Sequence, residues 1–152
     1  MKMPFIAFIL QGIPEDIALL TLSLTIVGIE LRWGKIVVAG TLLAFIIYLL
    51  RFLPISFGVH TIVALLLLIV FTTKIGEIKN LQISIMASLL SILALVTIEI
   101  ICLTLLTSIL GISEQEFISN TAFRILLSLP QVFILFLLAF IIKKVRRSRC
   151  VS

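Results

Sequence analysis

The stretch Ile83–Leu110, ISIMASLLSILALVTIEIICLTLLTSIL, is apolar over more residues than a helix needs to cross a bilayer. Its one acidic residue, Glu99, lies near the middle. Because a carboxylate in hydrocarbon is costly, we expect Glu99 to face other helices and either to have a polar partner or to stay protonated. The stretch therefore predicts a membrane-spanning helix around which the other segments pack.

Composition assigns the whole chain to the same class. Of its 152 residues, 62% are hydrophobic and only 12% are charged, with a mean hydropathy of +1.37. Long apolar runs with few charges are typical of a polytopic membrane protein. The net charge of +5 comes from basic residues at the ends of these runs, where they orient helices in the bilayer, so no nucleic-acid partner is expected. Cys102 and Cys150 lie far apart, and neither their spacing nor any other motif predicts a disulfide framework, a metal site or a cofactor.

The apolar runs predict an all-α fold with about five transmembrane helices in one domain, residues 1–142, and a short basic tail, residues 143–152. The expected spans cover residues 15–31, 36–53, 57–73, 83–110 and 122–142. Residues 4–10 are too few to span, which favours a short interfacial segment that ends at a break over residues 12–14. Glu15 and Asp16 then suit the positive end of the first spanning helix.

Small and hydroxyl residues recur at helical spacing and predict the faces on which the spans pack. In the first span these are Ala18, Thr21, Thr25 and Gly28, in the second Gly40 and Ala44 with Tyr48 and Arg51, and in the fourth Ser84, Ser88 and Ser91. Trp33, in the turn after the first span, is expected to anchor the chain at the membrane interface.

The distribution of basic residues predicts the orientation. Five spans place the two termini on opposite sides, and a cytoplasmic tail puts nine of the 12 basic residues on the inside. These nine are Arg32, Lys35, Lys74, Lys79, Lys143, Lys144, Arg146, Arg147 and Arg149. We therefore expect the N-terminus outside and the C-terminus in the cytoplasm.

With that orientation, several polar residues belong to the outer halves of the spans. They are Arg51, His60, Glu99, Arg124 and Gln131, with Glu15 and Asp16 at the rim. Together they predict a site, open to the outside, for a polar or charged ligand. The alternative is that these residues have structural roles. Glu99 would then form an ion pair with Arg51 or Arg124, or the two arginines would extend to the headgroups. His60 would bond to a carbonyl group, Glu15 and Asp16 would begin a helix, and the Gln131 amide would be satisfied beside the Pro130 kink.

A catalytic alternative rests on Cys102 and His60, because a Cys–His pair is the dyad of some membrane peptidases. Gram-positive peptidases that process signal peptides hold such a pair near the cytoplasmic face, whereas both residues here belong to the outer half. Cys102 also lies in a continuous apolar helix. We therefore expect Cys102 to be a core residue and the chain to have no catalytic activity. His60 and Glu99 alone are too few ligands for a metal.

Three stretches support a resemblance: residues 10–24 (LQGIPEDIALLTLSL), 34–61 (GKIVVAGTLLAFIIYLLRFLPISFGVHT) and 123–144 (FRILLSLPQVFILFLLAFIIKK). Together they resemble the membrane sensor region of histidine kinases from Gram-positive anaerobes, of the accessory-gene-regulator, peptide-sensing type. The clearest marks are residues 12–15 (GIPE), 51–54 (RFLP) and 57–60 (FGVH). The resemblance implies a bacterial plasma membrane and an extracellular signal that is passed to cytoplasmic kinase domains.

The chain departs from that family after the last span. A phosphoacceptor helix and an ATP-binding domain need on the order of 200 residues, so we expect this chain to lack kinase activity and to rely on a separate protein. The sequence thus predicts a non-catalytic sensing module that relays to a cytoplasmic histidine kinase or response regulator, alone or as a homodimer. The alternatives are a substrate-binding subunit of a small transporter, which Pro130 favours, and a structural subunit for membrane assembly.

Overall fold

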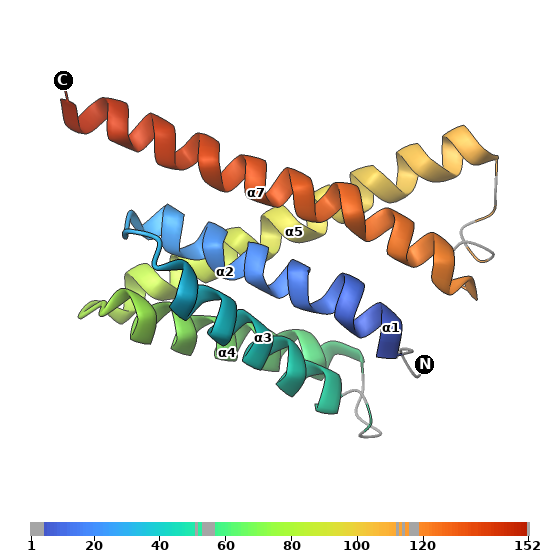
Figure 1. Ribbon diagram of the computed structural model, residues 1–152, viewed down its shortest axis with the longest axis horizontal. Helices are drawn as coiled ribbons and strands as arrows, with labels where there is room; N and C mark the ends of the chain where they lie inside the picture. Colours follow the sequence, from blue (N-terminus) through green and yellow to red (C-terminus); the bar gives the residue numbers. More distant parts are fainter. Residues whose placement is uncertain are drawn as a thin grey trace.

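The computed structural model describes residues 5–50, 52, 57–111, 113, 115 and 119–151, without the side chains of residues 57, 58, 124 and 149–151. Its helices are α1 (Phe5–Ala7), the π-helix η1 (Phe8–Gly12), α2 (Ile13–Val27), α3 (Trp33–Leu50), α4 (Phe57–Gly76), α5 (Leu81–Leu110) and α7 (Thr121–Val151) (Figure 1). Five helical runs in this part are long and apolar enough to cross a membrane: Phe5–Val27, Trp33–Leu50, Val59–Gly76, Leu81–Leu110 and Thr121–Ser148. The chain is an all-α polytopic membrane protein, as its composition predicted.

The central element is α2, which contacts α3, α4, α5 and α7 and runs between α7 on one side and α3 and α4 on the other (Figure 1). Every residue from Ala18 to Thr25 is buried. The expectation that the other segments pack around the residues of α5 was therefore wrong, because α5 buries only one stripe: Ser84, Ala87, Ser88, Ser91 and Cys102. Lipid is as apolar as a protein core, so small and hydroxyl residues mark the central helix better than hydrophobicity does.

The N-terminal segment is part of the first span. The predicted break over residues 12–14 is absent, since the helical run continues from Phe5 to Val27. A π-turn replaces the break, with the Ile13 amide donating to the Phe8 carbonyl oxygen. This wider turn directly precedes Pro14, which lies in the first turn of α2, where a missing amide donor is tolerated. Glu15 and Asp16 consequently lie well inside the spanning run and not at its rim.

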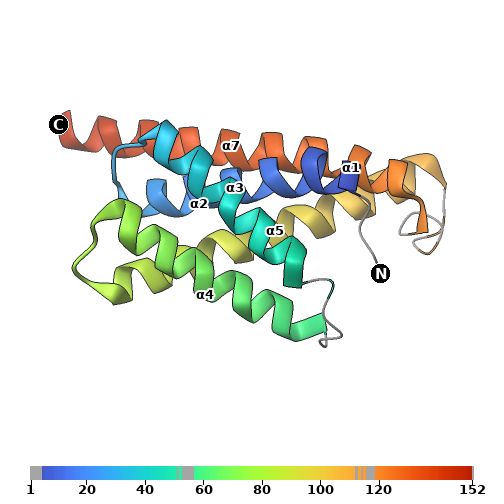
Figure 2. The ribbon, with the colours of Figure 1, turned by 60° about the horizontal axis from the view of Figure 1, so that its bottom comes forward.

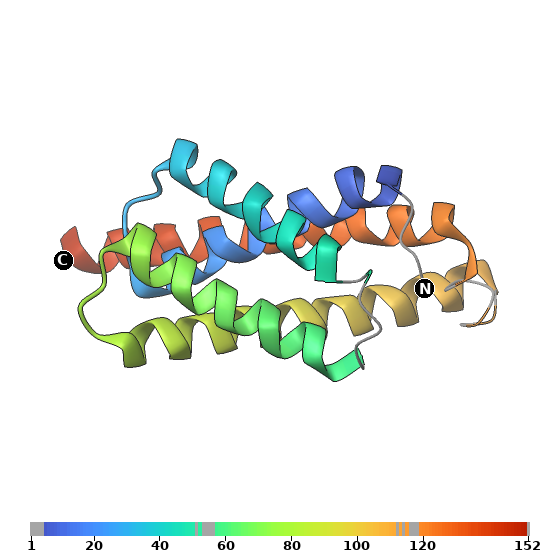
Figure 3. The same cartoon turned by 90° about the horizontal axis from the view of Figure 1, so that it is seen from below.

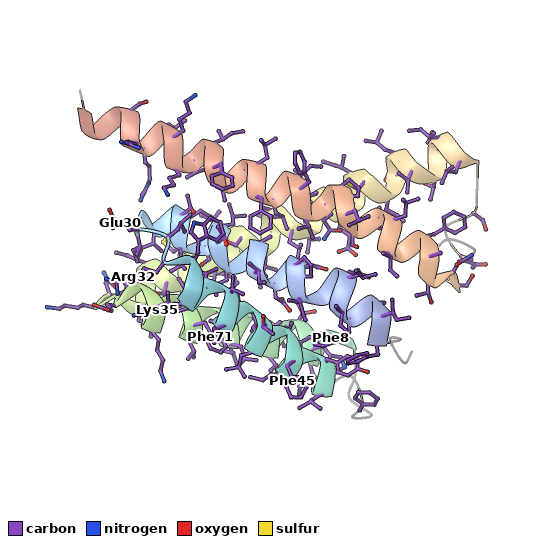
Figure 4. The ribbon with its side chains drawn as sticks, viewed as in Figure 1. Phe8, Glu30, Arg32, Lys35, Phe45 and Phe71 are labelled. Carbon is purple, nitrogen blue, oxygen red and sulfur yellow. The ribbon has the colours of Figure 1, made fainter. Side chains whose placement is uncertain are left out.

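The bundle has two distinct ends (Figures 2 and 3). The C-terminal end holds the α2–α3 connection, the α4–α5 turn and the end of α7, and the N-terminal end holds α1, the end of α3, the start of α4, the end of α5 and the start of α7. Figure 4 shows Glu30, Arg32 and Lys35 at the C-terminal end. There the Arg32 guanidinium and the Glu77 carboxylate form an ion pair of 3.7 Å between the α2–α3 connection and the α4–α5 turn. α1 and the end of α7 lie at opposite ends of the bundle (Figure 1).

The first two spans meet on the face predicted for the second. Gly40 of α3 lies against the backbone of Ile17, so closely that a Cβ atom there would stand 2.9 Å from the Ile17 Cα. Two turns further along α3, the Tyr48 ring stacks on Phe8 with centroids 4.4 Å apart. At the other end of α3, Trp33 is 43% exposed and tilts against the rings of Phe136 and Phe140 of α7.

A cluster of buried hydroxyl groups joins three spans. The Ser23 Oγ of α2 is 3.0 Å from the Thr72 Oγ1 of α4 and 3.4 Å from the Ser88 Oγ of α5. The nearby Ser84, one turn before Ser88, is also fully buried, but its Oγ has no hydrogen-bond partner among the described residues. The serines of α5 are therefore packing residues, as predicted, and Ser23 is the one that links α4 and α5 to α2.

These contacts predict different changes in stability when serine is replaced by alanine at two positions of the bundle. Ser23→Ala should lower the free energy of unfolding by about 1 kcal/mol, because the Thr72 and Ser88 hydroxyls both lose a buried partner. Ser84→Ala should leave stability unchanged or raise it, since it removes a buried hydroxyl that has no partner. Equilibrium unfolding of both variants in mixed micelles measures the difference, and equal losses would contradict the role given to Ser23.

Candidate functional site

The contact between α2 and α7 sets the register of the candidate site. Both helices run from the N-terminal end of the bundle to the C-terminal end (Figure 1). Ala18 and Leu22 of α2 form one buried cluster with Leu135 and Ala139 of α7. On each helix, the two residues of this cluster are four positions, or about one turn, apart. Because the helices are parallel, the same register can be followed towards the N-terminal end.

Two turns from that cluster the apolar interface becomes polar. The π-helix η1, which contains Gln11, contacts α7, and Ser128 lies seven residues, about two turns, before Leu135. Ser128 is 1% exposed and its Oγ donates to the Ile125 carbonyl oxygen over 2.8 Å. The Gln11 Oε1 is buried without a hydrogen-bond partner among the described residues. A buried acceptor of this kind can receive a hydrogen bond from a ligand or a water molecule.

The same faces add one amide and one acid. Gln131, one turn before Leu135, is 3% exposed. Glu15 precedes Ala18 by three residues and Leu22 by seven, so it lies on the face of α2 turned towards α7, where it is half-buried. We call Gln11, Glu15, Ser128 and Gln131 the α2–α7 polar site. Its amides and hydroxyl group can bind a polar molecule by hydrogen bonds.

Both helices are irregular at this level. The π-turn of η1 ends at Gly12, directly before α2, and Pro130 lies inside α7 beside Gln131. Proline has no amide hydrogen, so the carbonyl oxygen four residues earlier loses its helical donor. π-turns and buried prolines are the positions where a helix bends or shifts most easily. The polar site therefore coincides with the most deformable part of the α2–α7 contact.

Of the residues that the sequence grouped into one outer cluster, His60 and Glu99 lie on the neighbouring helices α4 and α5, and no hydrogen bond or ion pair joins them. His60 continues the inward stripe of α4 and is half-buried. Glu99 is exposed on α5, about 100° around the helix from Ile98, which packs towards α7. The expectation that Glu99 faces the other helices of this chain was wrong, because the inward stripe of α5 passes through Ile98 and Cys102.

The remaining predicted residues have different outcomes. Gln131 is buried at the α2–α7 contact, and Glu15 and Asp16 are half-buried within the first span, so their placement at a rim was wrong. Arg51 lies outside the described residues. Arg124 belongs to α7, but its side chain is also outside the description. Gln11 was missed, although it recurs seven residues before Ala18 and eleven before Leu22, as a member of the buried face should.

Cys102 lies in an apolar cluster between α5 and α7. Cys102 is 7% exposed and lies in an apolar cluster with Leu127, packed by Phe123 of α7 and Leu106 of α5. His60 belongs to α4, and no hydrogen bond joins its ring to Cys102 in the described part of the chain. Within the same residues, no three histidine, cysteine or acidic side chains gather closely enough to hold a metal ion.

Comparison of the chain with protein families, with curated proteins and with solved structures finds no match.

Proposed function

We propose that this protein is a ligand-sensing membrane module, in which a ligand bound at the α2–α7 polar site alters the position of α7. The observation that supports it best is the continuity of α7. This helix runs through 31 residues, from Thr121 to Val151, a length of about 46 Å. One continuous helix therefore joins the polar site to the basic residues at the C-terminal end.

The proposal includes an orientation. The C-terminal end of the bundle contains Arg32, Lys35, Lys74 and Lys79 as well as the basic residues of α7. Basic residues are retained on the cytoplasmic side of a membrane, so this end is assigned to the cytoplasm and Phe5 to the outside of a bacterial plasma membrane. A ligand then enters from outside, and a cytoplasmic histidine kinase or response regulator contacts the basic part of α7.

A ligand can alter α7 only if it binds one helix arrangement more tightly than another. Two features support such a difference: the polar groups of the site come from two helices, and each helix contains an irregular turn. A ligand that bonds to Gln11 and Gln131 together would favour the arrangement that brings these two amides within its reach. The Pro130 and η1 turns then absorb the change without breaking the apolar contact nearer the C-terminal end.

The test is purification of the protein from its native membrane into nanodiscs, followed by mass spectrometry of the proteins, peptides and small molecules that remain bound. A secreted peptide together with a kinase or response regulator is expected. Gln131→Leu should lose the peptide and keep its fold, because the new side chain has a similar volume and suits the membrane. Phe133→Leu, at a position that is 69% exposed on the same helix, is the control and should retain the peptide.

One observation also favours a transporter subunit. Two neighbouring spans, α1–α2 and α7, are continuous but each contains an irregular turn, the π-turn Phe8–Gly12 and Pro130, and discontinuous spans are typical of substrate sites in transporters. In the same experiment, an ATPase subunit that co-purifies with a metabolite would replace the sensing proposal with this one. A bound peptide and a regulator would exclude it.

A further inference from the structure

The ring of Trp33, in the first turn of α3, contacts α7 at the C-terminal end of the bundle. Its centroid lies 6.4 Å from that of Phe136 and 6.2 Å from that of Phe140. Trp33 and Phe140 are 43% and 48% exposed, so this aromatic contact also faces the surroundings of the bundle. Tryptophan favours the boundary between the hydrocarbon and the headgroups of a bilayer. The contact therefore indicates that this boundary lies near the level of Phe140.

The aromatic face of α7 continues as a basic face. Phe136, Phe140, Lys143 and Arg147 follow one another at spacings of four, three and four residues, so they lie on one side of the continuous helix. Along the helix axis, Lys143 lies about 4.5 Å and Arg147 about 10 Å beyond Phe140. The headgroup layer is roughly 5–8 Å thick, and long basic side chains reach back towards it. We call Trp33 and these four residues the α3–α7 edge.

The two basic side chains of this edge have no carboxylate partner among the described residues. Both are exposed, and neither forms an ion pair or a hydrogen bond there. The adjoining α2–α3 connection has one acid, Glu30, and its own cation Arg32 is paired with Glu77. The Arg146 guanidinium lies against Gly28, at the end of α2. The edge is therefore a positively charged surface, which suits an anionic group.

We infer that the α3–α7 edge binds an anionic phospholipid, with the phosphate group at Lys143 and Arg147 and the acyl chains along Phe136 and Phe140. The apolar and charged parts of the edge follow each other in the same order as those of a phospholipid, and a soluble phosphate compound has no apolar part to match. Cations without a carboxylate partner favour an anionic headgroup over a zwitterionic one. The site does not depend on ligand sensing, so the two proposals can fail separately.

The fluorescence of Trp33 provides the test, because Trp33 is the only tryptophan of the chain. The full chain is reconstituted into phosphatidylcholine vesicles that contain a small fraction of phosphatidylglycerol brominated on its acyl chains, since bromine quenches tryptophan fluorescence on contact. This lipid should quench Trp33 more strongly than the same fraction of brominated phosphatidylcholine. Soluble glycerol phosphate at millimolar concentration should not reverse the quenching.

Two double variants remove the same charge from the same end of the bundle. Lys143→Gln with Arg147→Gln should lower the binding constant of phosphatidylglycerol relative to phosphatidylcholine about fivefold or more, because one basic residue near an anionic surface already contributes about that factor. Lys74→Gln with Lys79→Gln is the matched control. These two lysines are exposed at the α4–α5 turn, and α4 lies on the other side of α2 from α7 (Figure 1). The control should keep the wild-type preference.

Three results would overturn the inference. The first is equal quenching by the two brominated lipids at equal fractions, and the second is reversal of the quenching by glycerol phosphate. The third is an equal loss of preference in the two double variants, which would mean that only the net charge of this end matters. All four substituted side chains are exposed, so both double variants should unfold at the wild-type temperature, which thermal unfolding in detergent checks.

Discussion

Replacing Gly40 with leucine is expected to separate α3 from α2 and to abolish the stable bundle. A Cβ atom at Gly40 would stand 2.9 Å from the Cα and 3.1 Å from the amide nitrogen of Ile17. These are backbone atoms, so no side-chain rotation relieves the overlap, and the two helices must move apart. Overpacking of a well-packed contact costs about 1–3 kcal/mol. The loss of stability extends to the cluster of Leu19, Leu20, Ile36 and Leu43, because the same contact between α2 and α3 buries these side chains.

The control uses the same helix and the same substitution. Gly34, in the first turn of α3, has no atom within 4 Å of the place where its Cβ would stand. Gly34→Leu should therefore leave the unfolding temperature unchanged or raise it, because leucine favours a helix over glycine. Thermal unfolding in detergent, followed by size-exclusion chromatography of the folded fraction, compares the two variants. If Gly34→Leu and Gly40→Leu lose the same stability, the close contact between α2 and α3 does not exist.

The sequence predicted the helices well because each apolar run has the length of a span and a basic residue near one end. It predicted Gly40 and the α5 serines as packing residues, and the structure confirms both. It did not predict that α2 is central. Within a membrane span nearly every side chain is apolar, so hydrophobicity along the sequence shows no periodicity that separates lipid-facing residues from buried ones. Only small and polar residues mark the buried face.

The candidate site was predicted less well, for two physical reasons. A Gly–Ile–Pro sequence breaks most helices, but here a π-turn over Phe8–Gly12 precedes the proline and keeps the run continuous. Gln11 and Glu15 therefore lie inside the first span. Glu99 was assigned to the interior because an acid in hydrocarbon needs a partner, and that argument does not say whether the partner belongs to the same chain.

The contact of Gly28 with Arg146 leads to the second large effect, at the C-terminal end. Gly28 ends α2 with a φ of 91°, and its amide donates to the carbonyl oxygens of Leu24 and Thr25, each over 3.0 Å. The Arg146 guanidinium occupies the space that a Cβ atom would need. A cation beside the last carbonyl groups of a helix is stabilising by about 0.3–1 kcal/mol. Gly28→Ala should therefore strain the backbone and displace the arginine from α2.

Gly111 separates these two effects. It ends α5 with a φ of 65° and has no atom within 4 Å of its Cβ position, so Gly111→Ala measures the backbone strain alone, about 1–2 kcal/mol. Gly28→Ala should cost more by about 1 kcal/mol, because it also loses the Arg146 contact. In a background of Arg146→Ala, the Gly28→Ala cost should fall to that of Gly111→Ala.

Equilibrium unfolding of the four variants measures these differences. Equal losses from Gly28→Ala and Gly111→Ala in the wild-type background would mean that Arg146 does not stabilise the end of α2. The predicted inequality would mean that the C-terminal part of α7 is attached to α2 at one point beyond the apolar contact. A helix that transmits a change from the polar site must release or strain that attachment.

Ligand binding should then alter the accessibility of a cysteine introduced at Lys143 in wild type more than in Arg146→Ala.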